Sequence, residues 1–428
     1  MMKQITILFI TLCTLHGIII AQNKQTVYTH ATLHIGNNQV ITNGILAIKN
    51  GKIKAASSTY TPLATDSVID ATNQHIYPGI IAPYITLGLT EVDAVRSTID
   101  FAEAGSINPH VRAQIAYNTD SKIIPTVRSN GVLIVQSTPR GGLISGQSSV
   151  MSLNGWNWED ATIKADDGVH INWPSLLVAS GWSELGPTGW EKNKNYETQL
   201  QTLTQFLYEA KAYNKTATTT INNQKLKAMK EVFDGNKRVY VYANSAKEIT
   251  EAITLLLKLE VKYPVIIGGA EAYKVPELFT KNNIPIIIGR THALPYKEDA
   301  DIYANTKLAN ELKNKNILFA ISDEGDMEAM QARNLPFQAG TTVAFGLTTE
   351  EALQAVTLNT AKIMGIDANY GSLEIGKNAT FFISTGDALD AKSNNVTTAY
   401  TNGLVVDLNN HQKELYGKYA TKFGLKKQ

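Results

Sequence analysis

The chain has 428 residues, which suits a large α/β barrel with an accessory module better than one small domain. Hydrophobic residues make up 43% and charged residues 18%, a composition that excludes disordered and fibrous proteins. Lys and Arg number 39 against 38 Asp and Glu, so no strong overall charge attracts nucleic acid or an anionic membrane. We therefore expect a small-molecule ligand or another protein as the partner.

The first residues have the pattern of a secretory signal peptide. Lys3 precedes an apolar run over residues 5–20, and the small residue Ala21 comes before polar sequence. We predict a signal peptide over residues 1–21, export to the periplasm, and no membrane attachment after cleavage. The alternative is an uncleaved anchor, although the run is shorter than the ~20 residues of a membrane span. The single cysteine, Cys13, lies in this segment, so we expect no disulfide and no cysteine-bound zinc in the mature chain.

Both ends of the chain are rich in strand signals. Residues 22–76 alternate apolar and polar side chains between turn signals at Asn43-Gly44 and Asn50-Gly51. Residues 365–410 have similar strands with Gly and Asn turns. We predict that these two segments form one composite β-sandwich, followed by a C-terminal tail over residues 411–428.

Residues 77–364 alternate between helical and strand patterns. The stretch "KEITEAITLLLKLE" has helical spacing at Ile249, Ile253, Leu256 and Leu257, and "YPVIIGG" after it is a short β-branched strand. The alternation repeats with short connections, which is typical of a parallel sheet. We predict an α/β fold with a (β/α)8 TIM barrel. A doubly wound sheet is the structural alternative, because periodicity does not distinguish the two.

Two segments of this region have unusual compositions. All five tryptophans fall between Trp156 and Trp190, which predicts either a long connection held by tryptophan packing or an aromatic lid over the barrel. The Gly-rich stretch "TPRGGLISGQSS", from Thr138 to Ser149, follows a predicted strand. Its backbone N–H groups are therefore candidates for binding an anion.

Four motifs between residues 27 and 407 occur in the same order as in a known family. They are "TNGILAIKNGKIKAASS", "IYPGIIAPYITLGL", "FAISDEG", and "LTTEEALQAVTLNTAKIMGI" followed by "GSLEIGKNATFFIS". Together they resemble the amidohydrolase superfamily, specifically its imidazolonepropionase-like branch. The resemblance implies a (β/α)8 barrel with a composite β-sandwich, and hydrolysis of non-peptide C–N bonds in small amides or cyclic amides. In the fourth motif, Thr348 and Glu351 have capping-box spacing and Gly365 marks the helix end.

The second motif departs from the family where the metal ligands belong. The family's first-strand pattern is P-G-x-I-D-x-H-x-H, and its Pro, Gly and Ile are present here. Ala82 replaces the aspartate, and Tyr84 and Thr86 replace the two histidines. Neither a phenol nor an alcohol substitutes for a neutral imidazole as a ligand of zinc.

Further ligand positions are also changed. Tyr242 stands at the ligand place of the fifth strand, and Gly268 and Gly269 stand where the sixth strand has a histidine. Only the eighth-strand aspartate remains, as Asp323. The family uses zinc or another divalent metal, so the resemblance here implies a degenerate site, and we expect no metal cofactor.

Five residues are candidates for a metal-free site. Asp323 is a candidate general base, and His292, which follows a predicted strand, is a candidate partner in an acid/base pair. Arg290 is a candidate for holding a ligand carboxylate, and Tyr84 and Tyr242 for donating hydrogen bonds to a carbonyl. Each also has a structural interpretation: a turn cap, a hydrogen-bonded histidine, a surface ion pair, or rings that fill vacated space.

The remaining histidines of the mature chain are expected to lie away from this site. His30, His34, His75 and His411 fall in predicted sandwich or tail segments, and His110 and His170 in predicted connections.

Three functions remain open at this point. The first is a hydrolase of C–N bonds, as the resemblance implies, and the second is a metal-free pseudoenzyme that binds a ligand or pairs with an active relative. The third is metal-free isomerisation by Asp323 and His292. We expect a homo-oligomer or a pair with an active paralogue, although no sequence feature requires either.

Overall fold

The computed structural model describes residues 25–183, 186–215, 222–295, 297 and 299–425. The predicted signal peptide and Cys13 lie outside these residues. Within them, no helix is both long enough and apolar enough to cross a membrane.

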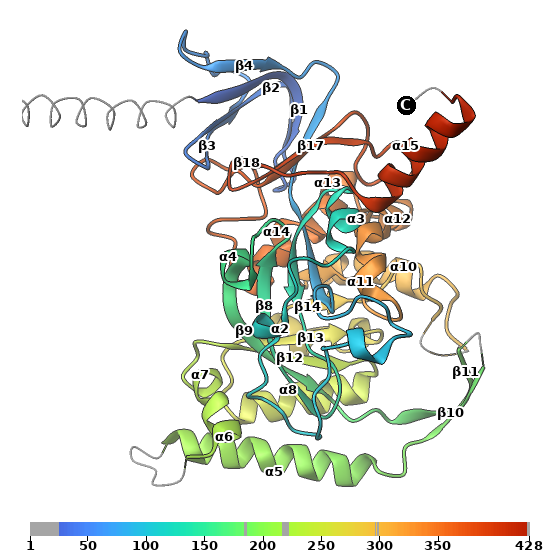
Figure 1. The fold of residues 1–428 in the computed structure, drawn as a ribbon. Coiled ribbons are helices and arrows are strands. Elements are labelled where there is room, and N and C mark those ends of the chain that lie inside the picture. Colours follow the sequence, from blue (N-terminus) through green and yellow to red (C-terminus); the bar gives the residue numbers. More distant parts are fainter. Residues whose placement is uncertain (1–24, 184–185, 216–221, 296, 298, 426–428) are drawn as a thin grey trace, which may run out of the picture.

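Both ends of the chain contribute to one β-sheet, which lies at one end of the molecule (Figure 1). The strand order is β18-β17-β16-β5-β1-β2-β3, and β4 pairs with β1. The N-terminal strands are β1 (Thr26–His34), β2 (Val40–Lys49), β3 (Lys52–Ser57), β4 (Ser67–Asp70) and β5 (His75–Pro78). The C-terminal strands are β16 (Phe381–Ser384), β17 (Val396–Thr401) and β18 (Leu404–Val405). The two ends join where β16 pairs antiparallel with β5, so the predicted β-rich unit built from both ends is confirmed.

A second sheet of eight strands forms the barrel, in the order β15-β14-β13-β12-β9-β8-β7-β6. The strands are β6 (Ile80–Ile85), β7 (Val132–Ser137), β8 (Ile144–Ser152), β9 (Thr162–Asn172), β12 (Arg238–Ala243), β13 (Pro264–Gly268), β14 (Ile286–Ile288) and β15 (Phe319–Ile321). At the seam, the Ser322 hydroxyl donates a hydrogen bond to the Pro83 carbonyl at 2.7 Å. The predicted α/β barrel is thereby confirmed in its class and strand number.

One strand departs from the regular pattern of a parallel barrel. β8 pairs antiparallel with both of its neighbours, β7 and β9, whereas the other pairings in the sheet are parallel. The connection over residues 138–143 is too short for a crossover helix, so the chain turns back as a hairpin. Its glycines Gly141 and Gly142 have φ values of 90° and 63°, which favour glycine at such a turn.

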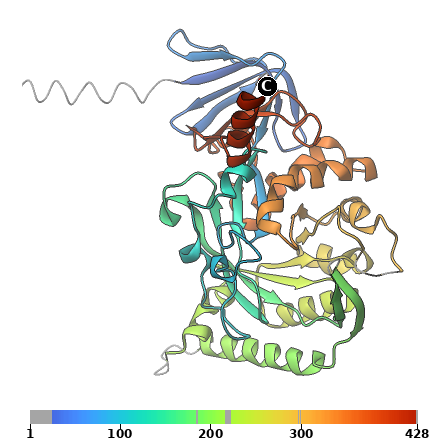
Figure 2. The same cartoon turned by 45° about the vertical axis from the view of Figure 1, so that its right-hand side comes forward.

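Helices cover the outside of the barrel, and the long α5 lies at the end of the molecule opposite the β1–β5 sheet (Figures 1 and 2). They are α2 (Ala113–Ala116), α3 (Ile124–Arg128), α4 (Trp158–Ala161), α5 (Tyr196–Lys215), α6 (Gln224–Ala228), α7 (Lys230–Phe233), α8 (Ala246–Lys258), α9 (Pro276–Asn282), α10 (Ala304–Asn314), α11 (Glu328–Gln331) and α12 (Leu335–Thr341). α8 begins with a capping box of Ser245 and Glu248, as amphipathic helices often do. Its predicted apolar face is buried at Ile249 and Ile253, whereas Leu257 is exposed.

The predicted helix after Thr348 is interrupted. The capping box of Thr348 and Glu351 is present, but the chain forms α13 (Thr349–Ala355) and then α14 (Leu358–Met364). The break coincides with a contact to the barrel, because the Val356 carbonyl accepts a hydrogen bond from the N–H of Ile81 at 2.9 Å. Gly365 ends α14 in the left-handed conformation, as predicted.

The last element is α15 (His411–Phe423), so most of the predicted tail is helical. The tryptophan-rich segment is not one irregular connection, because it contains β9 and a hairpin of β10 (Leu177–Ser183) and β11 (Gly186–Lys192). Trp173 is buried, but Trp156 and Trp190 are exposed, so general tryptophan packing does not hold this segment in place.

Candidate active site at the barrel mouth

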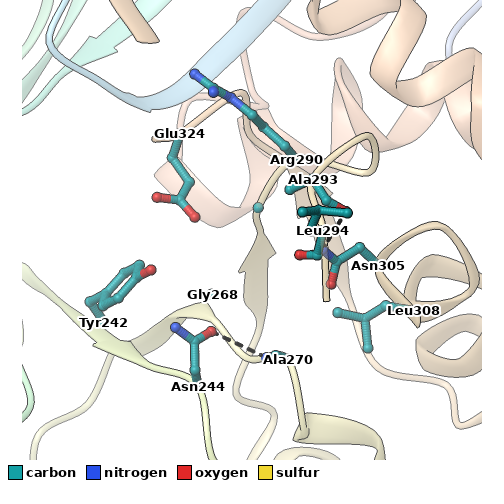
Figure 3. Close-up of a pocket in the computed structure, with 11 residues that line it drawn as sticks. Tyr242, Asn244, Gly268, Ala270, Arg290, Ala293, Leu294, Asn305, Leu308 and Glu324 are labelled. Carbon is teal, nitrogen blue, oxygen red and sulfur yellow. Dashed lines mark hydrogen bonds between the residues drawn. The ribbon is translucent and has the colours of Figure 1, made fainter. Parts of the chain in front are cut away.

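A cavity of about 570 Å³, here the mouth cavity, lies where the parallel barrel strands end. It is lined by Tyr84, Thr86, Arg140, Tyr242, Glu324 and Glu328, among other residues. An adjoining cavity of about 150 Å³, here the side cavity, shares Tyr242 and Glu324 and also contacts Arg290 (Figure 3). The carboxyl ends of barrel strands are the usual site of ligand binding in this fold.

Tyr84 is held in a strained backbone conformation at the end of β6. Its φ of 55° lies in the left-handed region, which is rare for a bulky residue and is typical of functional sites. The pairing of β6 with β7 is irregular here, and the Tyr84 N–H donates to the Gln136 side chain at 3.1 Å. Tyr84 and Thr86 both line the mouth cavity, as the alternation predicted, while Ala82 is fully buried.

Arg140 is a functional candidate that the sequence analysis missed. Its Nη2 donates to the Glu328 carboxylate at 2.7 Å and to the Tyr84 carbonyl at 2.8 Å. Its guanidinium carbon lies 3.5 Å from the centre of the Tyr84 ring, a cation–π contact. The signal was available, because Arg140 belongs to the Gly-rich stretch that follows a strand end.

Several backbone N–H groups of that Gly-rich stretch bond to the protein itself, so these groups are not free for the predicted anion. The N–H groups of Leu143 and Ile144 both donate to the Ser106 carbonyl, at 2.6 and 3.0 Å. A Cβ at Gly142 would lie 2.6 Å from the same carbonyl, so the glycine there allows a close approach of two chain segments.

The structure brings Asp323 and Arg290 together. The Arg290 Nε lies 2.8 Å from the Asp323 carboxylate, and Nη2 also donates to the Asp326 carbonyl at 2.7 Å. Burial raises the pKa of Asp323 to about 6, against the opposing effect of the Arg290 charge. Arg290 therefore holds the loop after β15 and neutralises Asp323, rather than presenting Nε and Nη2 to a ligand carboxylate.

The structure does not place the His292 ring beside Asp323. The ring contacts the Thr341 hydroxyl and lines a separate cavity of about 370 Å³ together with Asp387 and Asp390. Only the backbone links the two candidates, because the His292 N–H donates to the Gln338 side chain, which itself donates to Asp323 at 3.4 Å. The predicted acid/base pair of Asp323 and His292 is therefore not assembled in this geometry.

Glu324, the residue after Asp323, is the second candidate that the sequence analysis missed. It lines both the mouth cavity and the side cavity, and Tyr242 lines the same two cavities (Figure 3). It forms no ion pair with any described residue. Burial, and then the charge of Glu328, raises the pKa of Glu324 to about 7. A carboxyl group that exchanges its proton near neutral pH is suited to acid–base chemistry.

Tyr242 faces this carboxyl group. The charge of Glu324, followed by burial, raises the pKa of Tyr242, so its phenol stays protonated and can donate a hydrogen bond. The Tyr84 and Tyr242 rings are stacked, with their centres 6.1 Å apart.

His170 lies inside the barrel and not in a connection as predicted. β9 is eleven residues long and carries His170 beneath Tyr84, with the two ring centres 5.6 Å apart. On its other side the Tyr240 ring is stacked at 4.7 Å. Neither ring nitrogen has a hydrogen-bond partner among the described residues, and burial lowers the pKa of His170. It fills the barrel interior as a neutral ring.

The residues at the family's metal positions do not fit a zinc ion. Tyr84, Thr86, Tyr242 and Gly268 lie around the two cavities, and none of them is a ligand that zinc prefers. The remaining carboxylate, Asp323, is paired with Arg290. Among the residues that the structure describes, no group of three or more His, Cys, Asp or Glu side chains has a geometry that holds a metal.

Comparison with known proteins decides the family. The model of the family described as "Amidohydrolase family" matches residues 184–406, which is just over half of the chain. This chain belongs to the amidohydrolase family. The resemblance predicted from the four motifs is confirmed, and membership places the chain among hydrolases of C–N bonds.

Several known proteins share the fold or a short stretch of sequence with this chain. An amidohydrolase from Thermotoga maritima MSB8 has a similar structure, with a TM-score of 0.77 and 21% identity over 89% of this chain and 99% of that one. Molinate hydrolase is similar with a TM-score of 0.53 and 13% identity over 90% of this chain and 95% of that one. Imidazolonepropionase from Shewanella frigidimarina (strain NCIMB 400) is 62% identical over 37 residues, which is 9% of the length of each protein.

Proposed function

We propose that this protein is a metal-independent member of the amidohydrolase family that binds a small amide or cyclic amide in the mouth cavity. The main support is that Tyr84, Thr86 and Tyr242 occupy the positions of the family's metal ligands and still line a cavity. A pocket of this size with a few polar groups is typical of small-molecule sites.

The polar groups of the cavity match those of an amide. The Tyr84 hydroxyl forms no hydrogen bond with a described residue, and burial raises the pKa of Tyr84 to about 12, so it is available as a donor to a carbonyl oxygen. Glu324 offers an acceptor for an amide N–H on the same cavity. Tyr242 adds an aromatic ring to the lining of the same cavity.

Metal content and ligand binding test this proposal together. Protein purified with zinc and manganese present should contain far less than one metal ion per chain, measured by elemental analysis. A panel of small amides and cyclic imides should raise the Tm, and Tyr242→Ala should weaken binding about tenfold or more. Tyr208→Ala, an exposed tyrosine on α5, is the matched control and should bind normally. One metal ion per chain would contradict the proposal.

A second candidate function is metal-free hydrolysis of the bound C–N bond, and Glu324 favours it. In this reaction a water molecule attacks the carbonyl carbon while Glu324 takes one of its protons. The Tyr84 hydroxyl donates a hydrogen bond to the carbonyl oxygen, and Glu324 then returns the proton to the leaving nitrogen. The carboxyl group needs no other base, because its pKa of about 7 allows both steps.

The substitution Glu324→Gln tests this second function. Hydrolysis of the amide panel, measured with a chelator present, should fall about 100-fold or more because a neutral amide cannot accept the proton. Amide binding should persist. Glu197→Gln, on the exposed first turn of α5, should leave the rate unchanged. Equal rates in Glu324→Gln and the unsubstituted protein would remove Glu324 from any catalytic role.

The proposal also includes the cellular location of the protein and its partners. The signal-peptide pattern over residues 1–21 supports export to the periplasm, where a cysteine-free mature chain needs no redox protection. A homo-oligomer or a pairing with an active paralogue is part of the same proposal.

A further inference from the structure

The two cavities at the barrel mouth carry an excess of negative charge. Their lining includes four carboxylates, Asp93, Glu324, Asp326 and Glu328, against two guanidinium groups, Arg140 and Arg290.

Both arginines are already neutralised by the protein. Arg140 pairs with Glu328 at 2.7 Å, and Arg290 pairs at 2.8 Å with Asp323, which lies behind the cavity lining. None of the other three carboxylates of the lining forms an ion pair with a described residue.

The carboxylates of the lining repel one another, and the paired Glu328 takes part in this repulsion. The pKa of Asp93 is raised by burial and by the charges of Glu328 and Asp326, and that of Glu324 by burial and by Glu328. A site that crowds carboxylates in this way has unfavourable energy that a cationic ligand group would relieve.

The rest of the lining independently suits such a ligand. Phe101 and Tyr242 line the mouth cavity and are both partly exposed, so aromatic surface is available there to a cation. Tyr84 is only 5% exposed and lines the same cavity, and its hydroxyl has no hydrogen-bond partner among the described residues. One part of the cavity therefore offers a donor for a carbonyl, and another offers carboxylates and aromatic rings.

We propose that the mouth cavity selects an amide that also carries a cationic group, an ammonium or a guanidinium. This inference rests on the proposed amide-binding function and adds the charge of the ligand. The amide lies against Tyr84 and Glu324, and the cationic group lies against Asp93, Asp326 and the accessible rings. The same arrangement disfavours ligands with a second carboxylate, because the free carboxylates of the lining repel it.

Three probes of similar length test the proposal: 5-aminopentanamide, hexanamide and the monoamide of adipic acid. The first two differ in one terminal atom, which is an ammonium nitrogen in one and a methyl carbon in the other. Calorimetric titration at constant ionic strength should show 5-aminopentanamide binding about tenfold tighter than hexanamide, with the anionic probe weakest. In the double variant Asp93→Asn, Asp326→Asn this preference should fall to about twofold or less.

The control variant is Glu197→Gln with Glu277→Gln, two exposed carboxylates in the first turns of α5 and α9 that line neither cavity. It should keep the full preference. Equal or tighter binding of hexanamide or the anionic probe would overturn the charge selectivity while leaving amide binding intact. An absence of binding by all three probes would overturn both this inference and the proposed function. A preference unchanged in the double variant would overturn the role of Asp93 and Asp326.

Discussion

Four aromatic side chains form a continuous stack from the barrel mouth into its interior, and two of them, Tyr84 and Tyr242, stand at positions where the family pattern has histidines. Tyr242, Tyr84, His170 and Tyr240 follow one another with ring centres 4.7 to 6.1 Å apart. The Tyr240 hydroxyl donates to the buried Asp167 at 2.5 Å. The stack fills the interior of the barrel, and Tyr84, whose backbone is strained, lies within it between Tyr242 and His170.

At the residue scale, His170→Phe should stabilise the protein by about 1–3 kcal/mol. Phenylalanine keeps a ring of similar size between Tyr84 and Tyr240 and removes two buried nitrogens that lack partners. Urea unfolding of the two proteins measures the difference. The matched variant Tyr240→Phe should be destabilised, because it leaves Asp167 without its hydroxyl donor. A loss of stability in His170→Phe would show that the His170 ring is hydrogen-bonded in solution.

Short connections between elements determine how the barrel departs from regularity. The six residues between β7 and β8 force an antiparallel strand into the sheet, and Arg140 of this hairpin reaches the mouth cavity. The break between α13 and α14 lets the Val356 carbonyl join β6. In both cases a local irregularity supports the site.

The sheet built from both ends of the chain contacts the barrel helices through a series of ionisable side chains. His34 on β1 lies 2.6 Å from Glu350 on α13, and its other nitrogen lies 3.0 Å from His75 on β5. The His34 ring is stacked on Tyr77, and the charge of Asp387 acts on His75.

This chain of groups predicts a pH dependence of stability. Burial, and then the charge of His34, lowers the pKa of His75 below its ordinary 6.5, while Asp387 opposes the shift. As pH falls, the unfolded chain therefore binds a proton at His75 at a higher pH than the folded protein does. The contribution of His75 to stability is lost as pH falls below about 6.5. The Tm of the unsubstituted protein, relative to that of His75→Gln, should fall between about pH 7.5 and about pH 5.

The comparison with His75→Gln is needed because other groups act in the opposite direction. Asp323 and Glu324 have raised pKa values of about 6 and about 7, so their contribution is present at low pH and is lost as pH rises. Both proteins share these groups, and their effect cancels in the difference. A difference in Tm that does not change with pH would contradict the role of His75.

At the scale of the whole molecule, the chain forms strands β1 to β5, builds the barrel, and then returns to the first sheet, where β16 pairs with β5. The sheet is complete only when both ends are present. Residues from β6, β9, β12 and the segment after β15 meet at the barrel mouth, although they are up to about 240 positions apart. The site therefore depends on closure of the barrel.

The proposed export predicts a mature protein that begins at Gln22. Cleavage after Ala21 should remove the whole apolar run, and N-terminal sequencing of protein recovered from the periplasm measures this. A variant without residues 2–21 is the control and should stay in the cytoplasm. Recovery of the exported chain with residues 1–21 still attached would support the uncleaved anchor instead.

The sequence by itself determined the fold class, the contribution of both ends to one sheet, and the positions at which Tyr84, Thr86 and Tyr242 meet the cavity. These features follow from local periodicity and from motifs that keep their order along the chain. The reversed strand β8 and the interrupted C-terminal helix did not follow: the periodicity does not give the direction of a strand after a short hairpin connection, and the helix breaks where Val356 contacts the distant strand β6.

Only the tertiary structure decided which side chains make up the candidate site. It paired Arg290 with Asp323, turned the His292 ring toward another cavity, and placed His170 inside the barrel. It also brought Glu324 to the barrel mouth. The physical reason is that the direction of a side chain after a strand end is set by the turn and its neighbours, and not by the alternation that sequence patterns reveal.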